Sequence, residues 1–176
     1  DLMSKFGATF LPKNKFNFPL KIISSEIPIG IYYKAGVSAQ LKSAVMLAGL
    51  NSYGNTKIVE QEKSRDHTEN MLLKNSQVIK IKNGRKKIIE VKGKKKLIPI
   101  KINIPGDPSS AAFFTALTLL NYKSSIKIKN VCINPTRTGF YKILKKQGAK
   151  IKFENLKKEN GEMRANIVVK SCQLKP

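Results

Sequence analysis

The chain has 176 residues, of which 34 are Lys or Arg and 11 are Asp or Glu, so its formal net charge is +23. Hydrophobic residues make up 41% of it, which is ordinary for a globular protein with a core and excludes full disorder. No apolar run approaches the roughly 20 residues that span a bilayer. The two cysteines, Cys132 and Cys172, are too few for a disulfide scaffold, so a cytoplasmic protein is expected.

The positive charge invites a nucleic-acid interpretation, because Lys and Arg neutralise phosphates. Only four of the basic residues are Arg, the side chain that nucleic-acid readers favour, and Trp is absent. The lysines are spread from Lys5 to Lys175 and fall mainly on the polar phase of alternating segments. We therefore expect a solvated, lysine-rich surface and no nucleic-acid partner. Such a surface would also speed the encounter with an anionic small molecule.

The first half of the chain predicts alternating strands and helices. Short β-rich runs indicate strands, at 20–24, 29–34 and 57–60. Apolar residues recur at helical spacing from Leu41 to Ala48, and Ser38 is the expected N-cap of that helix. Ser64 is expected to open and cap a second helix that runs through Leu73.

The next segments predict a hairpin, then an extended stretch and a break. Residues 77–82 and 86–92 alternate on either side of Asn83-Gly84, which is a strong hairpin signal. Residues 97–104 alternate again and are expected to be extended. The chain then breaks at Pro105-Gly106-Asp107-Pro108.

The second half of the sequence again predicts helices and strands in alternation. Ser109 or Ser110 is expected to cap a helix at 111–120, which precedes a strand at 126–129. A further helix runs to about Lys146, and the last strand pair, at 151–153 and 167–169, surrounds the Asn160-Gly161 turn.

This order of elements occurs twice. Thr68 and Thr138, each at the start of an expected helix, are about 70 residues apart, a period too long for a solenoid repeat. We therefore expect an α/β fold built from a repeated β-α-β-α-β-β unit.

Four short segments carry a more specific signal through their order and spacing: Ser38 to Ala44, Ser64 to Glu69, Pro105 to Phe113, and Asn134 to Gly139. Together they resemble the 5-enolpyruvylshikimate-3-phosphate synthase family (3-phosphoshikimate 1-carboxyvinyltransferases), and most of all its glyphosate-tolerant bacterial class. The resemblance runs along the whole chain.

The resemblance implies a function and an architecture. The family transfers the enolpyruvyl group of phosphoenolpyruvate to the 5-hydroxyl of shikimate 3-phosphate and releases phosphate, on the route to chorismate and the aromatic amino acids. It uses no metal or organic cofactor and is expected to be monomeric. Its fold is a two-domain, inside-out α/β barrel of such repeated units. Residues 1–103 would belong to one domain and residues 104–176 to the other.

The resemblance also implies the binding residues. Ser38, Ala39 and Gln40 would contact shikimate 3-phosphate at a helix start, where N–H groups and the helix dipole favour a phosphate. Gln40 can donate and accept hydrogen bonds, so it would also lie near phosphoenolpyruvate. Arg65 matches a family arginine that contacts shikimate 3-phosphate, and its planar guanidinium suits phosphate oxygens.

The remaining polar residues of the segments are interpreted as structural. Lys42 is expected to face solvent, whereas Asp66, His67 and Glu69 are expected to form hydrogen bonds between elements. Asp107 and its neighbours would cap a helix, and Arg137 is interpreted in the same structural sense.

No residue here matches the family's catalytic acid and base. Because the sequence starts with Asp1 and those groups are missing, we expect a piece from the middle of a longer chain that is inactive alone. Two rivals remain open besides a homologue that has lost activity. One is the related enolpyruvyl transferase acting on UDP-N-acetylglucosamine, which typically carries a catalytic Cys; the other is a lysine-rich nucleic-acid-binding domain.

Overall fold

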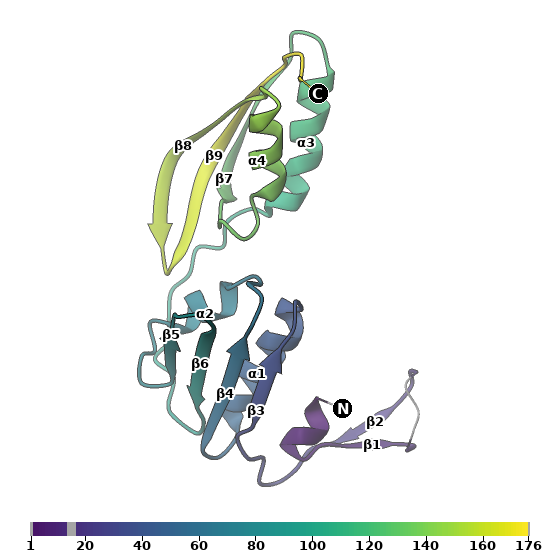
Figure 1. Ribbon diagram of the computed structural model, residues 1–176, viewed down its shortest axis with the longest axis vertical. Coiled ribbons are helices and arrows are strands. Elements are labelled where there is room, and N and C mark those ends of the chain that lie inside the picture. Colours follow the sequence, from purple (N-terminus) through teal and green to yellow (C-terminus); the bar gives the residue numbers. More distant parts are fainter. Residues whose placement is uncertain (1, 14–16, 176) are drawn as a thin grey trace. The chain divides into compact units, whose positions relative to one another are not determined.

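Strands and helices alternate along the computed structural model, which describes residues 2–13 and 17–175 (Figure 1). It divides into two units, Asp1–Pro99 and Ile100–Pro176. The elements of the first are η1 (Met3–Phe6), β1 (Thr9–Leu11), β2 (Lys21–Ile23), β3 (Tyr32–Ala35), α1 (Ala39–Asn51), β4 (Asn55–Glu60), α2 (His67–Leu72), β5 (Ile79–Lys82) and β6 (Lys87–Lys92). Those of the second are α3 (Pro108–Leu120), β7 (Ser125–Cys132), α4 (Gly139–Lys146), β8 (Lys150–Glu159) and β9 (Glu162–Lys170).

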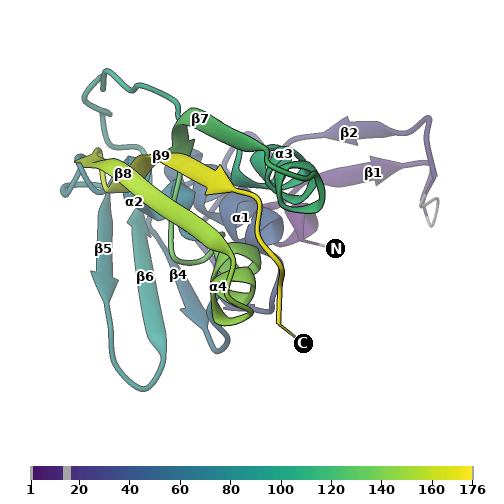
Figure 2. The same cartoon turned by 90° about the horizontal axis from the view of Figure 1, so that it is seen from above.

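The first unit is built on a four-stranded sheet in the order β3-β4-β6-β5. Strands β3 and β4 are parallel. Strand β6 is antiparallel to both β4 and β5, its hairpin partner (Figure 2). Val45 and Met46 of α1 pack with Ile58 and Ile89 of the sheet, and Leu72 of α2 joins the same core. This core fixes α1 and α2 to the sheet.

The second unit has an antiparallel sheet in the order β7-β9-β8. Tyr141 of α4 and Ala111 of α3 pack with Ile167 in its core. Gly106 forms a parallel bridge to Val131 of β7, so it stands where β3 stands beside β4 in the first unit. The repeated order of elements expected from the sequence is therefore present, with its leading strand reduced to one bridge in the second unit.

One expected helix cap is wrong, and a second falls on Asp107, which was interpreted as part of a cap, rather than on Ser109 or Ser110. Helix α2 begins at His67 with Asp66 at its N-cap position, because the Ser64 side chain and backbone N–H both donate to Glu60 instead. Helix α3 is capped by Asp107, whose carboxylate accepts a hydrogen bond from the Ser110 N–H at 2.9 Å. The cap that Ser38 was expected to provide is confirmed.

The closing hairpin is longer than its apolar residues indicated. Strands β8 and β9 reach Glu159 and Glu162, beside the expected turn at Asn160 and Gly161. The middle of β8 is polar and exposed, so it carries no alternation of apolar residues. The strand β1 was not expected either.

Lys42 does not face solvent, which corrects that expectation. Its side chain is fully buried in the first turn of α1, and its ammonium lies 2.8 Å from Glu60 Oε1 and 2.7 Å from Glu69 Oε1. Burial raises the pKa of Glu60, but hydrogen bonds from Lys42 and Ser64 outweigh it and leave that pKa lowered. A partly buried Lys87 contacts Glu69 from the outer side at 3.0 Å. These four charges form the buried ion cluster of the first unit.

Helix α3 is apolar on nearly all sides. Phe113, Leu117 and Leu120 are 79%, 59% and 83% exposed although other positions of the same helix lie in the core. Such a helix is typical of one surrounded by a larger core. Among the described residues, no helix is both long and apolar enough to cross a membrane.

The lowered pKa of Glu60 predicts an acid-dependent stability. Its contribution is fully present above the ordinary value of 4.5 and is lost as the pH falls through the lower folded value. Glu60→Gln should therefore lower the free energy of unfolding by about 1–3 kcal/mol at neutral pH and flatten its decline between about pH 6 and pH 3. Urea unfolding across that range measures this. Glu90→Gln, at a solvent-facing pair with Lys82, is the control, and an equal flattening there would contradict the assignment.

Gly93 is a position where only glycine fits. A Cβ there would lie 1.8 Å from the backbone oxygen of Ser52 and 2.6 Å from that of Gly49. We expect Gly93→Ala to lower the free energy of unfolding by about 2 kcal/mol or more, because backbone must move. Gly84→Ala, whose Cβ meets nothing closer than 3.8 Å, is the matched control in the same thermal unfolding experiment. Equal effects of the two changes would show that the close packing around Gly93 is wrong.

Candidate functional site

The start of helix α1 has the features of an anion-binding position. Ser38 caps it, with its hydroxyl oxygen accepting a hydrogen bond from the Leu41 N–H at 3.3 Å. That bond uses a lone pair and leaves the hydroxyl proton available for donation. The N–H groups of Ala39 and Gln40 belong to the first turn, where helix geometry supplies no internal acceptor. Three donors therefore lie at the positive end of the helix dipole.

A hollow of about 390 Å³ adjoins this helix start. Its walls are formed by one face of α1 and by the segment that leads into α2, namely Ala39, Gln40, Ser43, Ala44, Leu47, Arg65 and His67. The size is within the range of pockets that hold small organic molecules. The hollow lies entirely within the first unit.

The structure brings three of the four expected binding residues to this hollow. Ala39 and Gln40 enter it from α1, and Arg65 enters from the opposite segment although it is 25 residues further along the chain. Ser38 does not line the hollow but lies next to it as the cap of α1. Gln40 and Arg65 are both exposed, so their polar groups are available to a ligand.

Two lining residues were not expected as site residues. Ser43 lies one turn after Ala39, and its hydroxyl is 2.7 Å from that of Thr68 at the start of α2. His67 is the first residue of α2. Their contribution depends on how α1 and α2 pack together, a property that a short motif does not carry.

The charges of this hollow suit an anion. Arg65 offers a planar, permanently charged guanidinium, and the start of α1, which adjoins the same hollow, offers N–H groups. Apolar walls from Ala44 and Leu47 lower the competition from water for these donors. The arrangement can bind and orient a small phosphorylated molecule.

In the second unit, the expected structural roles of Asp107 and Arg137 have matching contacts. Arg137 Nη2 forms an ion pair with Asp107 Oδ1 and lies 2.9 Å from the Ser109 hydroxyl. The backbone N–H of Ser110 is the largest influence that lowers the pKa of Asp107, and the Arg137 guanidinium adds to it. The pair thus joins the start of α3 to the loop before α4.

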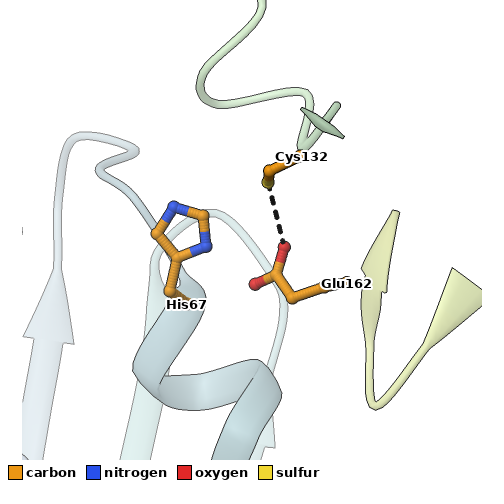
Figure 3. Close-up of side chains that lie close together, drawn as sticks. All are labelled: His67, Cys132 and Glu162. Atoms are coloured by element: carbon orange, nitrogen blue, oxygen red, sulfur yellow. Dashed lines mark hydrogen bonds between the residues drawn. The ribbon is translucent and has the colours of Figure 1, made fainter. Parts of the chain in front are cut away.

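Cys132 is not an activated nucleophile. Its Sγ lies 3.8 Å from Glu162 Oε2 (Figure 3). The same carboxylate oxygen accepts a hydrogen bond from Asn134. Burial raises the pKa of the Cys132 thiol, so the thiolate needed for nucleophilic attack is disfavoured. This thiol gives no support to the rival enzyme with a catalytic Cys.

Comparison with known proteins extends the resemblance. Residues 2–176 match the family described as EPSP synthase (3-phosphoshikimate 1-carboxyvinyltransferase). A 3-phosphoshikimate 1-carboxyvinyltransferase of Paramagnetospirillum magneticum is 40% identical over 99% of this chain and 40% of its own length. One from Sulfurihydrogenibium sp. is 41% identical over 98% of this chain and 41% of its own length.

A solved structure shows the same likeness in three dimensions. EPSP synthase from Acinetobacter baumannii matches with a TM-score of 0.81 and 38% identity, over 99% of this chain and 39% of that one. This chain therefore spans about two fifths of the length of the relatives that it matches.

These matches confirm the α/β fold class and the family, and they do not favour either rival. The glyphosate-tolerant class, the two domain assignments and the four binding residues stay predictions. From its match along almost every residue and its similarity in three dimensions, this chain belongs to the EPSP synthase family.

Proposed function

We propose that this chain supplies the shikimate 3-phosphate half-site of an enzyme that transfers the enolpyruvyl group of phosphoenolpyruvate to the 5-hydroxyl of shikimate 3-phosphate, with release of phosphate. The observation that carries the proposal is the hollow that brings Gln40 and Arg65 together beside the start of α1. Its relatives bear the name of this reaction.

The chemistry of the hollow matches a phosphorylated sugar acid. The N–H groups at the start of α1 and the Arg65 guanidinium recognise an anionic oxygen, while the Ser38 hydroxyl adds a donor. Gln40 can accept from a ring hydroxyl with its carbonyl and donate to a second anion with its amide, which suits a residue between two substrates. The whole charge of +23 draws such anions toward the protein.

The role proposed for these residues is binding and orientation. Transfer of the enolpyruvyl group moves protons at the 5-hydroxyl and at the methylene carbon of phosphoenolpyruvate, so the reaction needs a general acid and base. We assign neither group to this chain. Its function is therefore tested by ligand binding rather than by turnover.

Titration of the chain with shikimate 3-phosphate should shift the amide signals of Ser38–Lys42 and of Arg65–His67 in proton–nitrogen correlation NMR spectra. Arg65→Ala should weaken this binding about tenfold or more, because a charge-assisted hydrogen bond contributes about 1.5–3 kcal/mol. Arg65→Lys should recover only part of the loss, since an ammonium lacks the planar pair of donors.

Arg85→Ala is the matched control, because Arg85 is an exposed arginine of the same unit that does not line the hollow. It should leave the affinity near that of the unchanged chain. An equal loss of affinity in both variants would show that the effect comes from the overall charge of the chain and not from a contact of Arg65 with the ligand. Shifts of the same amides with UDP-N-acetylglucosamine, and none with shikimate 3-phosphate, would favour the rival substrate and contradict the proposal.

A further inference from the structure

One carboxylate oxygen behind the hollow accepts three hydrogen bonds. Glu60 Oε1 lies 2.8 Å from Lys42 Nζ, 2.9 Å from the backbone nitrogen of Ser64 and 2.6 Å from the Ser64 hydroxyl. Glu60 is the last residue of β4, so these bonds fold the chain that follows β4 back over the strand end. Because Ser64 immediately precedes Arg65, the oxygen also sets where the Arg65 backbone begins.

Lys42 connects this turn with the helix start. It lies two residues after Gln40 in the first turn of α1, and its ammonium bonds Glu60 at the end of β4 and Glu69 in α2. The Ser43–Thr68 hydroxyl contact joins α1 and α2 at the next position along the helix. Lys42 therefore connects α1 directly with α2, and through Glu60 with the Ser64 turn that precedes Arg65.

The cluster has a buried centre and a more accessible edge. The side chains of Lys42, Glu60 and Glu69 are 0%, 2% and 1% exposed, whereas that of Lys87 is 21% exposed. The contact of Lys87 with Glu60 is longer, 3.6 Å to Oε2, whereas Lys42 and Ser64 bond Oε1. Removal of Lys42 and removal of Lys87 each take one positive charge from the cluster. Only the removal of Lys42 deletes a direct partner of the oxygen that holds Ser64.

We propose that Lys42 is a positioning residue of the half-site: through Glu60 Oε1 and Ser64 it holds Arg65 opposite Gln40 at the separation that the ligand requires. Lys42 does not line the hollow and acts only through these neighbours. The inference rests on the proposed function for the identity of the ligand, but the geometry that it describes exists without one.

A double-mutant cycle tests this. The dissociation constant for shikimate 3-phosphate is measured by NMR titration for the unchanged chain, Lys42→Met, Arg65→Ala and the double variant. If Lys42 acts through Arg65, Lys42→Met weakens binding about tenfold alone and has almost no further effect when Arg65 is already absent. Losses that simply add, or an unchanged affinity in Lys42→Met, would overturn the proposal.

Two variants separate positioning from stability. Lys87→Met also removes a cation from the cluster, so it should lower the unfolding temperature and leave the affinity near that of the unchanged chain. Lys42→Arg should recover most of the affinity by keeping a cation beside Glu60. If Lys42→Met does not fold, Ser64→Ala replaces it in the cycle, with a loss of about threefold expected and the same absence of additivity with Arg65→Ala.

A ligand-free measurement distinguishes failure of this inference from failure of the proposed function. In Lys42→Met, and not in Lys87→Met, hydrogen exchange of the Ser64 amide should accelerate at least about tenfold, because its acceptor is no longer held in place. If the unchanged chain does not bind shikimate 3-phosphate, the proposed function fails, and this exchange rate alone decides the positioning role. An unchanged rate at Ser64 would overturn that role.

Discussion

A buried ammonium must be paired, and in the first unit this requirement connects the strand end, both helices and the turn beside the hollow. Lys42 is fully buried, so its charge is tolerated only because Glu60 and Glu69 lie within 3 Å of it. Glu60 comes from β4 and Glu69 from α2. Glu60 also accepts hydrogen bonds from the backbone N–H and the hydroxyl of Ser64. Under the proposed positioning role, a change that disturbs this cluster affects the half-site as well as the core.

The placement of charge matters more than its total. A net charge of +23 by itself is compatible with many anionic partners. At the hollow, however, one guanidinium-bearing side chain lines the same small space as the helix start, together with apolar residues, and we propose that this arrangement suits a small anion. Arg65 directly precedes the N-cap position of α2, and the positive end of that helix dipole is an unfavourable place for a cation in the absence of an anion. That local conflict is typical of a binding site rather than of a solvated surface.

The two units show the same topology, but the leading strand of the first unit is reduced to a single bridge in the second. In each, a parallel contact leads into an antiparallel set of strands, through β3 in the first unit and through Gly106 in the second. The second also exposes Phe113 and Leu120 on an otherwise core-forming helix. These features fit a chain that spans about two fifths of the length of the relatives that it matches.

Local signals explain most of what the sequence predicted correctly. The Ser38 cap depends on a contact only three residues away, and the hairpin turn at Asn160-Gly161 depends on two adjacent residues. The Asp107 cap is equally local, but a serine pair beside it offered the same chemistry and was the wrong choice. The family segments pointed to four proposed binding residues, and three of them line one hollow.

Tertiary contacts explain what was missed. A lysine in an expected helix is normally assigned to the solvent-facing side, as Lys42 was. Only the fold reveals that Glu60, 18 residues further along the chain, is its partner. The role of Ser64 was misassigned for the same reason, because Glu60 competes with the helix for its hydroxyl. Buried polar pairs carry no periodicity, so no pattern along the chain reports them.

The most direct test of the account is a crystal structure of this chain with shikimate 3-phosphate. The account predicts ligand oxygens within hydrogen-bond distance of the Arg65 guanidinium, the Gln40 amide and the N–H groups at the start of α1, with the Lys42–Glu60–Ser64 contacts unchanged. Ligand bound instead at the lysine-rich β5–β6 hairpin, with the hollow beside α1 unoccupied, would contradict it.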